Sequence, residues 1–327
     1  MEYLYYSYLY SGEYERARWL SKSFSAAARA YTGSDKLKAF SFATLEAGMG
    51  VTDSTTQFDN YYYMQASAGF YVNNRFSMYN AFSYFTQQDF RGITNQYQYY
   101  LNSKVPLKNG WSLTVGVQPI VQSYSQTVYT KDSSVFRVIP SKKPPHALDS
   151  NLYKDTSITS QASAQTKINM IGAITLTKSI SHFDFTIGTA IGTFDTTTQY
   201  EHYVGLVYYP MGNNFLSIGG TLYAHTENYY KLMNYGAVPY ITINTGPLSL
   251  TLSYLTNTGG NLIEGTGYIV NETPDFMVAR YSCLATVALS KCISLYANYQ
   301  HQDNDEEHKH WPFYYNLFIT GIKFVPK

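Results

Sequence analysis

Apolar and polar residues alternate with a period of two along most of this chain. Between Leu248 and Tyr254, every second residue is Leu or Tyr, and the residues between them are Ser or Thr. The stretches from Trp111 to Gln118 and from Lys167 to Leu176 show the same alternation. Because successive side chains of a β-strand point to opposite faces, these stretches predict strands with one apolar and one polar face. Fourteen such segments are centred near residues 45, 66, 81, 101, 117, 170, 188, 206, 221, 240, 251, 282, 297 and 319.

The connections between these segments alternate between tight and long. Tight connections, with turn residues or a short polar bend, fall at 72–75, 107–110, 177–181, 211–214, 244–247 and 289–291. Longer ones fall near 52–60, 89–95, 130–161, 195–201, 226–234, 256–275 and 302–312. Short turns on one side and longer loops on the other are typical of outer-membrane barrels, which have an even number of strands. The sequence therefore predicts an all-β transmembrane fold, an antiparallel up-and-down β-barrel of about 14 strands.

The first 33 residues follow a different pattern. Tyr14, Ala17, Leu20 and Phe24 recur at helical spacing, and this period disappears after Gly33. We therefore predict a short helical segment at residues 1–33 on the periplasmic side and a transmembrane barrel at residues 34–327. The N-terminus lacks the basic stretch and apolar run of a secretory signal, so we expect a processed chain or a start further upstream.

Composition narrows the class of protein. Charged residues make up 14% of the chain against a usual value of about 25%, and Tyr alone supplies 35 residues. No run of 18 apolar residues is present, which excludes transmembrane helices. Only helices and closed β-barrels pair all their backbone groups inside lipid, so the closed barrel is the membrane-spanning structure that remains. The net charge of +1 and the scattered basic residues argue against nucleic-acid binding. Cys283 and Cys292 have no partners at zinc spacing, and we expect no cofactor.

Two short motifs resemble parts of known families. The segment from Phe313 to Phe324 resembles the last strand of outer-membrane barrels, and this resemblance implies that Phe324 is an assembly signal. The stretch from Gly12 to Ala17, with Tyr14 inside it, is similar to the start of the second helix of a tetratricopeptide repeat. Together they resemble the tetratricopeptide-linked barrels that export polysaccharides. The Tyr-rich barrel with its Asn-Asn turns also resembles outer-membrane proteins of Bacteroidota.

The polar face of the strands is expected to line the lumen. The predicted lumen residues are Glu46, Gln65, Gln98, Tyr100, Lys104, Lys167, Asp184, Tyr240, Arg280, Asn298 and Lys323. A Lys or Arg facing lipid near the midplane would cost about 2 to 4 kcal/mol, which supports this assignment of the faces. The set holds a surplus of two positive charges, four basic against two acidic residues. We also expect inward tyrosines such as Tyr63 and Tyr79 to narrow the pore.

These features predict an outer-membrane channel for a small solute or polymer that is anionic or sugar-like. The alternative is a non-conducting barrel that anchors or scaffolds an outer-membrane complex through its N-terminal helix or its extracellular loops. The expected partners are outer-membrane lipids and an outer-membrane or periplasmic protein. The connection at 130–161 is long enough to fold into the pore or to present a partner surface.

One loop is a candidate metal site. His301, His308 and His310 lie within ten residues of one another, together with four carboxylates, and imidazole and carboxylate groups bind divalent cations. The same run is also typical of a solvated loop. The chain contains no Gly-x-Ser-x-Gly, no His-Glu-x-x-His and no phosphate-binding glycine loop, so we expect no catalytic residues and no enzyme activity.

Overall fold

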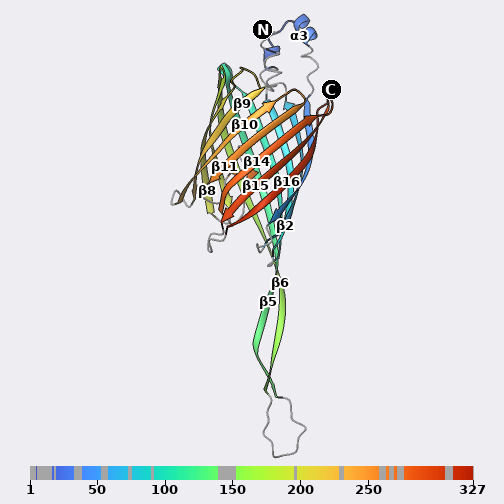
Figure 1. Ribbon diagram of the computed structural model, residues 1–327, viewed down its shortest axis with the longest axis vertical. Helices are drawn as coiled ribbons and strands as arrows, with labels where there is room; N and C mark the ends of the chain where they lie inside the picture. Colours follow the sequence, from blue (N-terminus) through green and yellow to red (C-terminus); the bar gives the residue numbers. More distant parts are fainter. Residues whose placement is uncertain are drawn as a thin grey trace, which may run out of the picture.

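Fourteen strands form one closed antiparallel barrel (Figure 1). The computed structural model describes residues 5, 17, 20–32, 39–52, 58–72, 76–89, 92–138, 152–194, 197–227, 232–257, 263–264, 269–270, 276–305 and 312–326. The barrel strands are β1 (Phe40–Thr52), β2 (Phe58–Val72), β3 (Phe76–Asp89), β4 (Gly92–Pro106), β5 (Trp111–Val138), β6 (Leu152–Ile180), β7 (Phe183–Phe194), β8 (Thr197–Tyr208), β9 (Leu216–Glu227), β10 (Leu232–Asn244), β11 (Leu248–Asn257), β14 (Phe276–Ala288), β15 (Ile293–Asp305) and β16 (Pro312–Phe324). The prediction of a fourteen-stranded up-and-down barrel is confirmed, and each predicted centre lies inside a strand.

Each strand pairs with its neighbour along the chain, and the last pairs with the first. The seam between β1 and β16 runs in unbroken register from Ala43 opposite Phe324 to Thr52 opposite Tyr315. Lipid offers no hydrogen-bond partners, so an open edge here would leave backbone groups unpaired. Closure of the seam is what allows this sheet to cross a membrane.

Large apolar side chains cover the outside of the barrel. Leu45, Ile168, Ile187 and Leu222 are between 58% and 72% exposed, whereas the residues next to them in sequence face inward. A soluble protein rarely leaves so much contiguous apolar surface uncovered. This outer wall is therefore the surface that contacts lipid.

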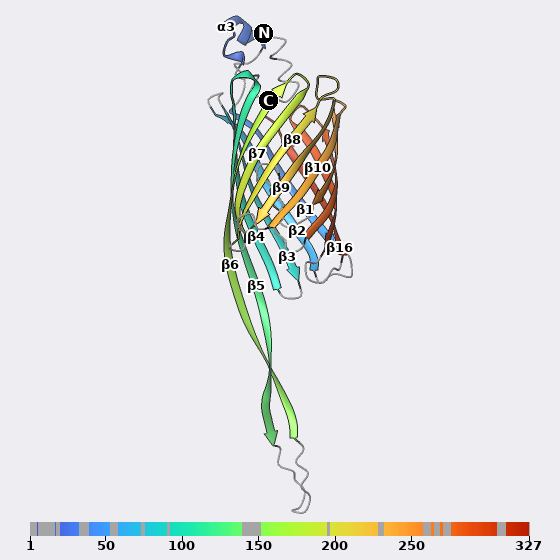
Figure 2. The same cartoon turned by 90° about the vertical axis from the view of Figure 1, so that its left-hand side faces the viewer.

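The two ends of the barrel differ. The helix α3 (Ala26–Thr32) and the end of β16 lie at one end of the barrel, which also carries the short turns, and we call it the terminal rim (Figure 1). The turn η2 (Lys108–Gly110) at this rim has a left-handed residue at Asn109, as expected from its Asn-Gly sequence. The opposite end, which we call the hairpin rim, is where β5 and β6 continue as a long two-stranded ribbon beyond the barrel (Figure 2).

Two predicted loops have a different structure. Residues 130–161 were expected to be a loop, but β5 and β6 pair through most of this stretch, which leaves only 139–151 between them. The alternating polar and β-branched residues there fit a solvated ribbon without a membrane-facing side. In the connection from β11 to β14, β12 (Ile263–Glu264) pairs with β13 (Ile269–Val270) in a small sheet separate from the barrel.

The described part of the N-terminus is helical and has a small core. Ser25 Oγ accepts a hydrogen bond from the backbone N–H of Ala28, which caps the first turn of α3. Tyr5, Ala17 and Phe24 are buried together, and the rings of Tyr5 and Phe24 meet edge to face. Among the described residues, no helix is long and apolar enough to cross a membrane. The domain boundary at residue 33 stays a prediction.

An inward aromatic ring and a glycine cooperate at the barrel seam. Tyr296 on β15 lies directly opposite Gly321 on β16, which in turn lies opposite Glu46 on β1. A Cβ atom at Gly321 would overlap the Tyr296 ring. Because the glycine has no side chain, the ring crosses β16 and its hydroxyl donates a hydrogen bond of 2.6 Å to Glu46. One aromatic side chain thus connects three strands across the seam.

The same arrangement recurs on the other side of the barrel. Tyr203 on β8 lies over Gly188 on β7, and its hydroxyl is hydrogen-bonded to Thr175 on β6. Glycines opposite aromatic residues are a known means of fixing register in curved sheets. These rings lie along the wall rather than across the lumen. The expectation that inward tyrosines such as Tyr63 and Tyr79 narrow the pore stays a prediction.

We expect Gly321→Ala to destabilise the barrel. The new methyl group must displace the Tyr296 ring and break its hydrogen bond to the Glu46 carboxylate, an interaction of about 1.5 to 3 kcal/mol. Urea unfolding in lipid vesicles measures the change. Gly172→Ala is the matched control, because its Cβ would meet its nearest neighbour, Ile191 Cγ2, at an ordinary 3.9 Å. Equal unfolding curves for the two variants would contradict the role of Gly321.

Candidate functional site: the lumen and the segment that enters it

The lumen residues expected from the sequence lie on the inner wall, opposite the exposed apolar face. The structure places all eleven on this face, which follows from the alternation along each strand. Lys167 is exposed near the hairpin rim, whereas Arg280 is buried below that rim. Whether a solute contacts these residues stays a prediction.

The half of the lumen next to the terminal rim is lined by half-buried polar groups. The Glu46 carboxylate accepts hydrogen bonds of 2.6 Å from both Tyr63 and Tyr296. The Gln65 side chain, which is itself buried, joins this network because its Oε1 accepts a hydrogen bond of 2.8 Å from the Tyr63 hydroxyl. Asn298 accepts a hydrogen bond from Ser282, 3.0 Å away on β14. This half therefore presents many hydrogen-bonding groups that remain partly accessible.

Charged groups lie close to the terminal rim. Asp184 accepts a hydrogen bond of 3.0 Å from the Tyr209 hydroxyl. The ammonium group of Lys323 lies 4.7 Å from the centre of the Phe42 ring, in a cation–π contact. Lys104, on β4, lies two residues from the end of its strand. These groups surround the opening of the lumen at this end.

Nearer the hairpin rim the inner wall is densely packed. Gln118 is 1% exposed and donates a hydrogen bond of 2.7 Å to Gln98. On the terminal-rim side of Gln98, the Tyr100 ring packs edge to face against Tyr79. Across the lumen, Tyr203, Tyr223, Leu255 and Met277 form a buried apolar cluster. The difference in burial divides the lumen into an accessible half and a closed half.

A residue from outside the barrel sheet contributes to this closure. Ile263, in β12, is 1% exposed and packs against Ile120, Ile171, Ala173 and Ala190 on the inner wall of β5, β6 and β7. We call these four wall residues the seat. Ile263 therefore enters the lumen from the connection between β11 and β14.

A buried carboxylate binds the backbone of this segment. Glu201 lies opposite Ala190 on one side and His225 on the other, in the middle of three paired strands. It is fully buried, and its Oε2 accepts a hydrogen bond of 2.9 Å from the backbone N–H of Ile263. Burying a carboxylate is costly unless it is paired. Glu201 thus links the segment to the wall.

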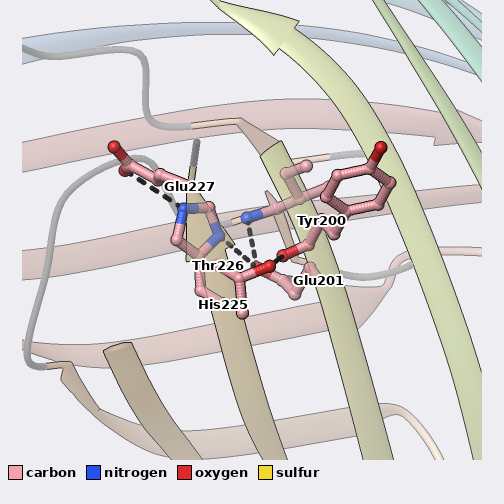
Figure 3. A network of polar contacts seen from close by, with 6 residues as sticks. Tyr200, Glu201, His225, Thr226 and Glu227 are labelled. Atoms are coloured by element: carbon pink, nitrogen blue, oxygen red, sulfur yellow. Dashed lines mark hydrogen bonds and ion pairs between the residues drawn. The ribbon is translucent and has the colours of Figure 1, made fainter. Parts of the chain in front are cut away.

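His225 lies between two carboxylates (Figure 3). Its Nδ1 is 3.6 Å from Glu201 Oε2, and its Nε2 is 3.2 Å from Glu227 Oε1. The Nε2 contact is within hydrogen-bond distance, whereas Nδ1 lies within ion-pair distance of Glu201 but beyond hydrogen-bond distance. Because each carboxylate faces a different ring nitrogen, the three side chains do not converge on one metal position. The arrangement holds Glu201 in place.

The energies that hold the segment are modest beside those of the barrel. Burying one Ile side chain contributes about 1.5 to 3 kcal/mol. A hydrogen bond to a charged group contributes about 1.5 to 3 kcal/mol more. Every strand of the barrel, in contrast, is paired with a neighbouring strand along both edges. The contacts of Ile263 can therefore break while the wall remains intact.

The structure changes the expected charge of the lumen. Glu201 and Glu227 also face inward, which the sequence analysis did not include. On the described inner wall of the barrel, the four basic residues Lys104, Lys167, Arg280 and Lys323 are then matched by the four acidic residues Glu46, Asp184, Glu201 and Glu227, and a protonated His225 adds one positive charge. The surplus of two positive charges is thereby reduced to one at most.

Sequence reasoning missed Glu201 and Glu227 because both were assigned to connections. The run from Thr197 to Glu201 is so polar that it was assigned to a loop, yet it forms the start of β8. Its inward residues, Gln199 and Glu201, alternate with the outward Tyr200 and His202. This alternation was the available signal. Nothing in the sequence indicated that Ile263 would enter the lumen.

The other candidate residues lie on the outer wall or outside the described chain. His301, on β15, faces outward, where its Nε2 lies 3.2 Å from Asp303 and its Nδ1 2.9 Å from Asn316. His308 and His310 lie outside the described residues. Within the described part of the chain, no group of three His, Cys, Asp or Glu side chains is arranged to hold a metal ion. Phe324 ends β16 and is exposed on the outer wall.

Comparison with known proteins identifies the fold. No protein-family model and no curated protein sequence matches the chain. Among solved structures, a FadL homologue of Pseudomonas aeruginosa matches with a TM-score of 0.51 at 9% identity, over 88% of this chain and 90% of that one. CymD, a monoaromatic hydrocarbon channel, matches with a TM-score of 0.51 at 5% identity, over 93% and 94%. A mutant of the monoaromatic hydrocarbon channel TodX gives 0.52 at 8%, over 87% and 89%.

The chain has the fold of bacterial outer-membrane β-barrels. At these identities the likeness concerns the fold alone. Together with the apolar outer wall, it places the protein in the outer membrane. Because such barrels carry short turns on the periplasmic side, we expect the terminal rim to face the periplasm, which stays a prediction.

We expect His225→Ala to destabilise the barrel by about 3 to 5 kcal/mol, because it leaves the Glu201 carboxylate buried without its charged neighbour. Unfolding in urea, followed by tryptophan fluorescence, measures this loss. His202→Ala is the matched control, since His202 is on the neighbouring strand but exposed on the outer wall. A loss for His225→Ala no larger than the control's would contradict the buried ion-pair geometry.

Proposed function

We propose that this barrel is a channel for small hydrogen-bonding solutes of a sugar-like kind. The observation that carries the proposal is the wall of the half next to the terminal rim, where Glu46, Tyr296 and Asn298 remain partly accessible and the Tyr296 ring lies over Gly321. Two of the structures with a similar fold are described as hydrocarbon channels, which supports transport as the use of the barrel.

The charge of the inner wall distinguishes between the anionic and the sugar-like solutes expected from the sequence. The balance of acidic and basic groups on the described inner wall gives little preference for anions. Hydrogen-bonding groups such as Tyr63, Gln65 and Asn298 match the hydroxyl groups of a sugar, and aromatic faces match its apolar side. Neutral polar solutes therefore suit this lumen better than anionic ones.

The second candidate function is that of an anchor. It is favoured by the dense packing at the hairpin rim, where Gln118, Glu201 and Met277 are almost fully buried. In this reading, the lumen stays closed and the N-terminal helical segment or the extracellular ribbon binds an outer-membrane or periplasmic protein. The resemblance to tetratricopeptide-linked barrels and to Bacteroidota proteins supports such a partner.

Planar-bilayer recordings of the purified protein distinguish the two functions. For a channel, we expect stable openings whose cation-to-anion permeability ratio rises severalfold in Lys104→Glu, because charge reversal at the lumen opening attracts cations. Lys108→Glu is the matched control, since Lys108 lies in the turn η2 at the rim. A bilayer that stays silent with correctly folded protein would contradict the channel and favour the anchor.

A further inference from the structure

We propose that the Glu46 carboxylate on the inner wall is a binding site for the protonated amine of a sugar-like solute. The inference rests on the proposed channel and names its substrate class, which is amino sugars. It is carried by one juxtaposition: a partly accessible carboxylate is held by two tyrosine hydroxyls, and no cationic side chain among the described residues forms an ion pair with it.

The described polar groups around Glu46 offer acceptors to a ligand rather than donors. Tyr296 donates to Glu46 Oε2 and Tyr63 donates to Glu46 Oε1, each at 2.6 Å, and the buried Gln65 lies 2.8 Å from the Tyr63 hydroxyl. A tyrosine hydroxyl has one proton, which these contacts already use, whereas each carboxylate oxygen can accept a further hydrogen bond. A ligand must therefore bring the donors. An ammonium group has three donors and no acceptor.

A basic neighbour at the barrel seam does not neutralise Glu46. Phe42, Thr44 and Glu46 are successive inward positions of β1, and Lys323 lies opposite Thr44. The Lys323 ammonium group lies 4.7 Å from the centre of the Phe42 ring, so the side chain extends toward the terminal rim and away from Glu46. The negative charge of Glu46 therefore remains available to attract a cationic ligand.

An aromatic ring and a second carboxylate suit the same solute. The Tyr296 ring, which lies over Gly321, is partly exposed, and it adds a cation–π attraction for an ammonium group beside it. On β7, six strands along the barrel from β1, Asp184 accepts a hydrogen bond of 3.0 Å from the Tyr209 hydroxyl. A carboxylate held by a tyrosine hydroxyl thus occurs twice on the inner wall, which gives a passing amine a second place to bind.

Saturation-transfer NMR of the folded full chain in nanodiscs of zwitterionic lipid measures the binding directly. Glucosamine and glucose are the probes, because they differ only in an ammonium group that replaces one hydroxyl at slightly acidic pH. We expect glucosamine to bind about fivefold more tightly than glucose, since an ion pair at a partly accessible site contributes about that factor. Equal affinities of the wild-type protein for the two sugars would overturn the inference.

Glu46→Gln tests whether this carboxylate is the source of the preference. The amide keeps the size of the side chain and an acceptor for the tyrosine hydroxyls but has no charge, so we expect the preference for glucosamine to disappear. Asp303→Asn is the matched control, because it removes a carboxylate that lies beside His301 on the outer wall. A preference that survives Glu46→Gln in folded protein would overturn the site.

Tyr296→Phe keeps the test decisive if Glu46→Gln does not fold. This variant retains the ring over Gly321 and frees one oxygen of the Glu46 carboxylate, so we expect the preference for glucosamine to be kept. Loss of the preference in folded Tyr296→Phe protein would show that the hydroxyl, and not the carboxylate charge, recognises the solute, and it would overturn the inference.

Swelling of liposomes that contain the protein separates this inference from the proposed function. If both sugars enter the liposomes but the NMR titrations show no preference, the amine site is overturned and the channel stands. If the preference is found but folded protein admits neither sugar, the channel is overturned and Glu46 remains an amine site in a closed barrel. Absence of both the preference and the uptake would overturn both proposals.

Discussion

Backbone pairing in lipid is the constraint on which the rest of this structure depends. A strand inside a bilayer has no water to satisfy its N–H and C=O groups, so the sheet must close on itself. The register from Ala43 opposite Phe324 to Thr52 opposite Tyr315 provides that closure. Once the sheet is closed, successive side chains of each strand face lipid and the lumen in turn. The polar side chains of the strands therefore line the lumen.

The two halves of the lumen differ in how they pack their large side chains. A tyrosine that lies over a glycine, as Tyr296 lies over Gly321, connects three neighbouring strands. In the closed half, Ile263 packs against the inner wall and Glu201 accepts a hydrogen bond from its backbone N–H.

The sequence predicts the barrel well because its signals are local. A period of two and alternating connections require no knowledge of distant contacts, and they placed all fourteen strands. The balance of lumen charge was wrong because Glu201 and Glu227 lie at strand ends, where a polar run looks like a loop. The position of Ile263 could not be predicted from the sequence, because it depends on a pocket formed by three strands that are distant in the chain. The ribbon of β5 and β6 was assigned to a loop because solvated strands lack an apolar face.

Hydroxyl-radical footprinting of the protein in lipid nanodiscs tests the central claim most directly, namely that the lumen is accessible from the periplasm and closed toward the outside. The account predicts rapid modification of Tyr240 and Tyr296 in the accessible half and strong protection of Met277 and Tyr223, although methionine is intrinsically the more reactive residue. Modification of Met277 as fast as that of Tyr296 would show a lumen open along its whole length and would contradict the account.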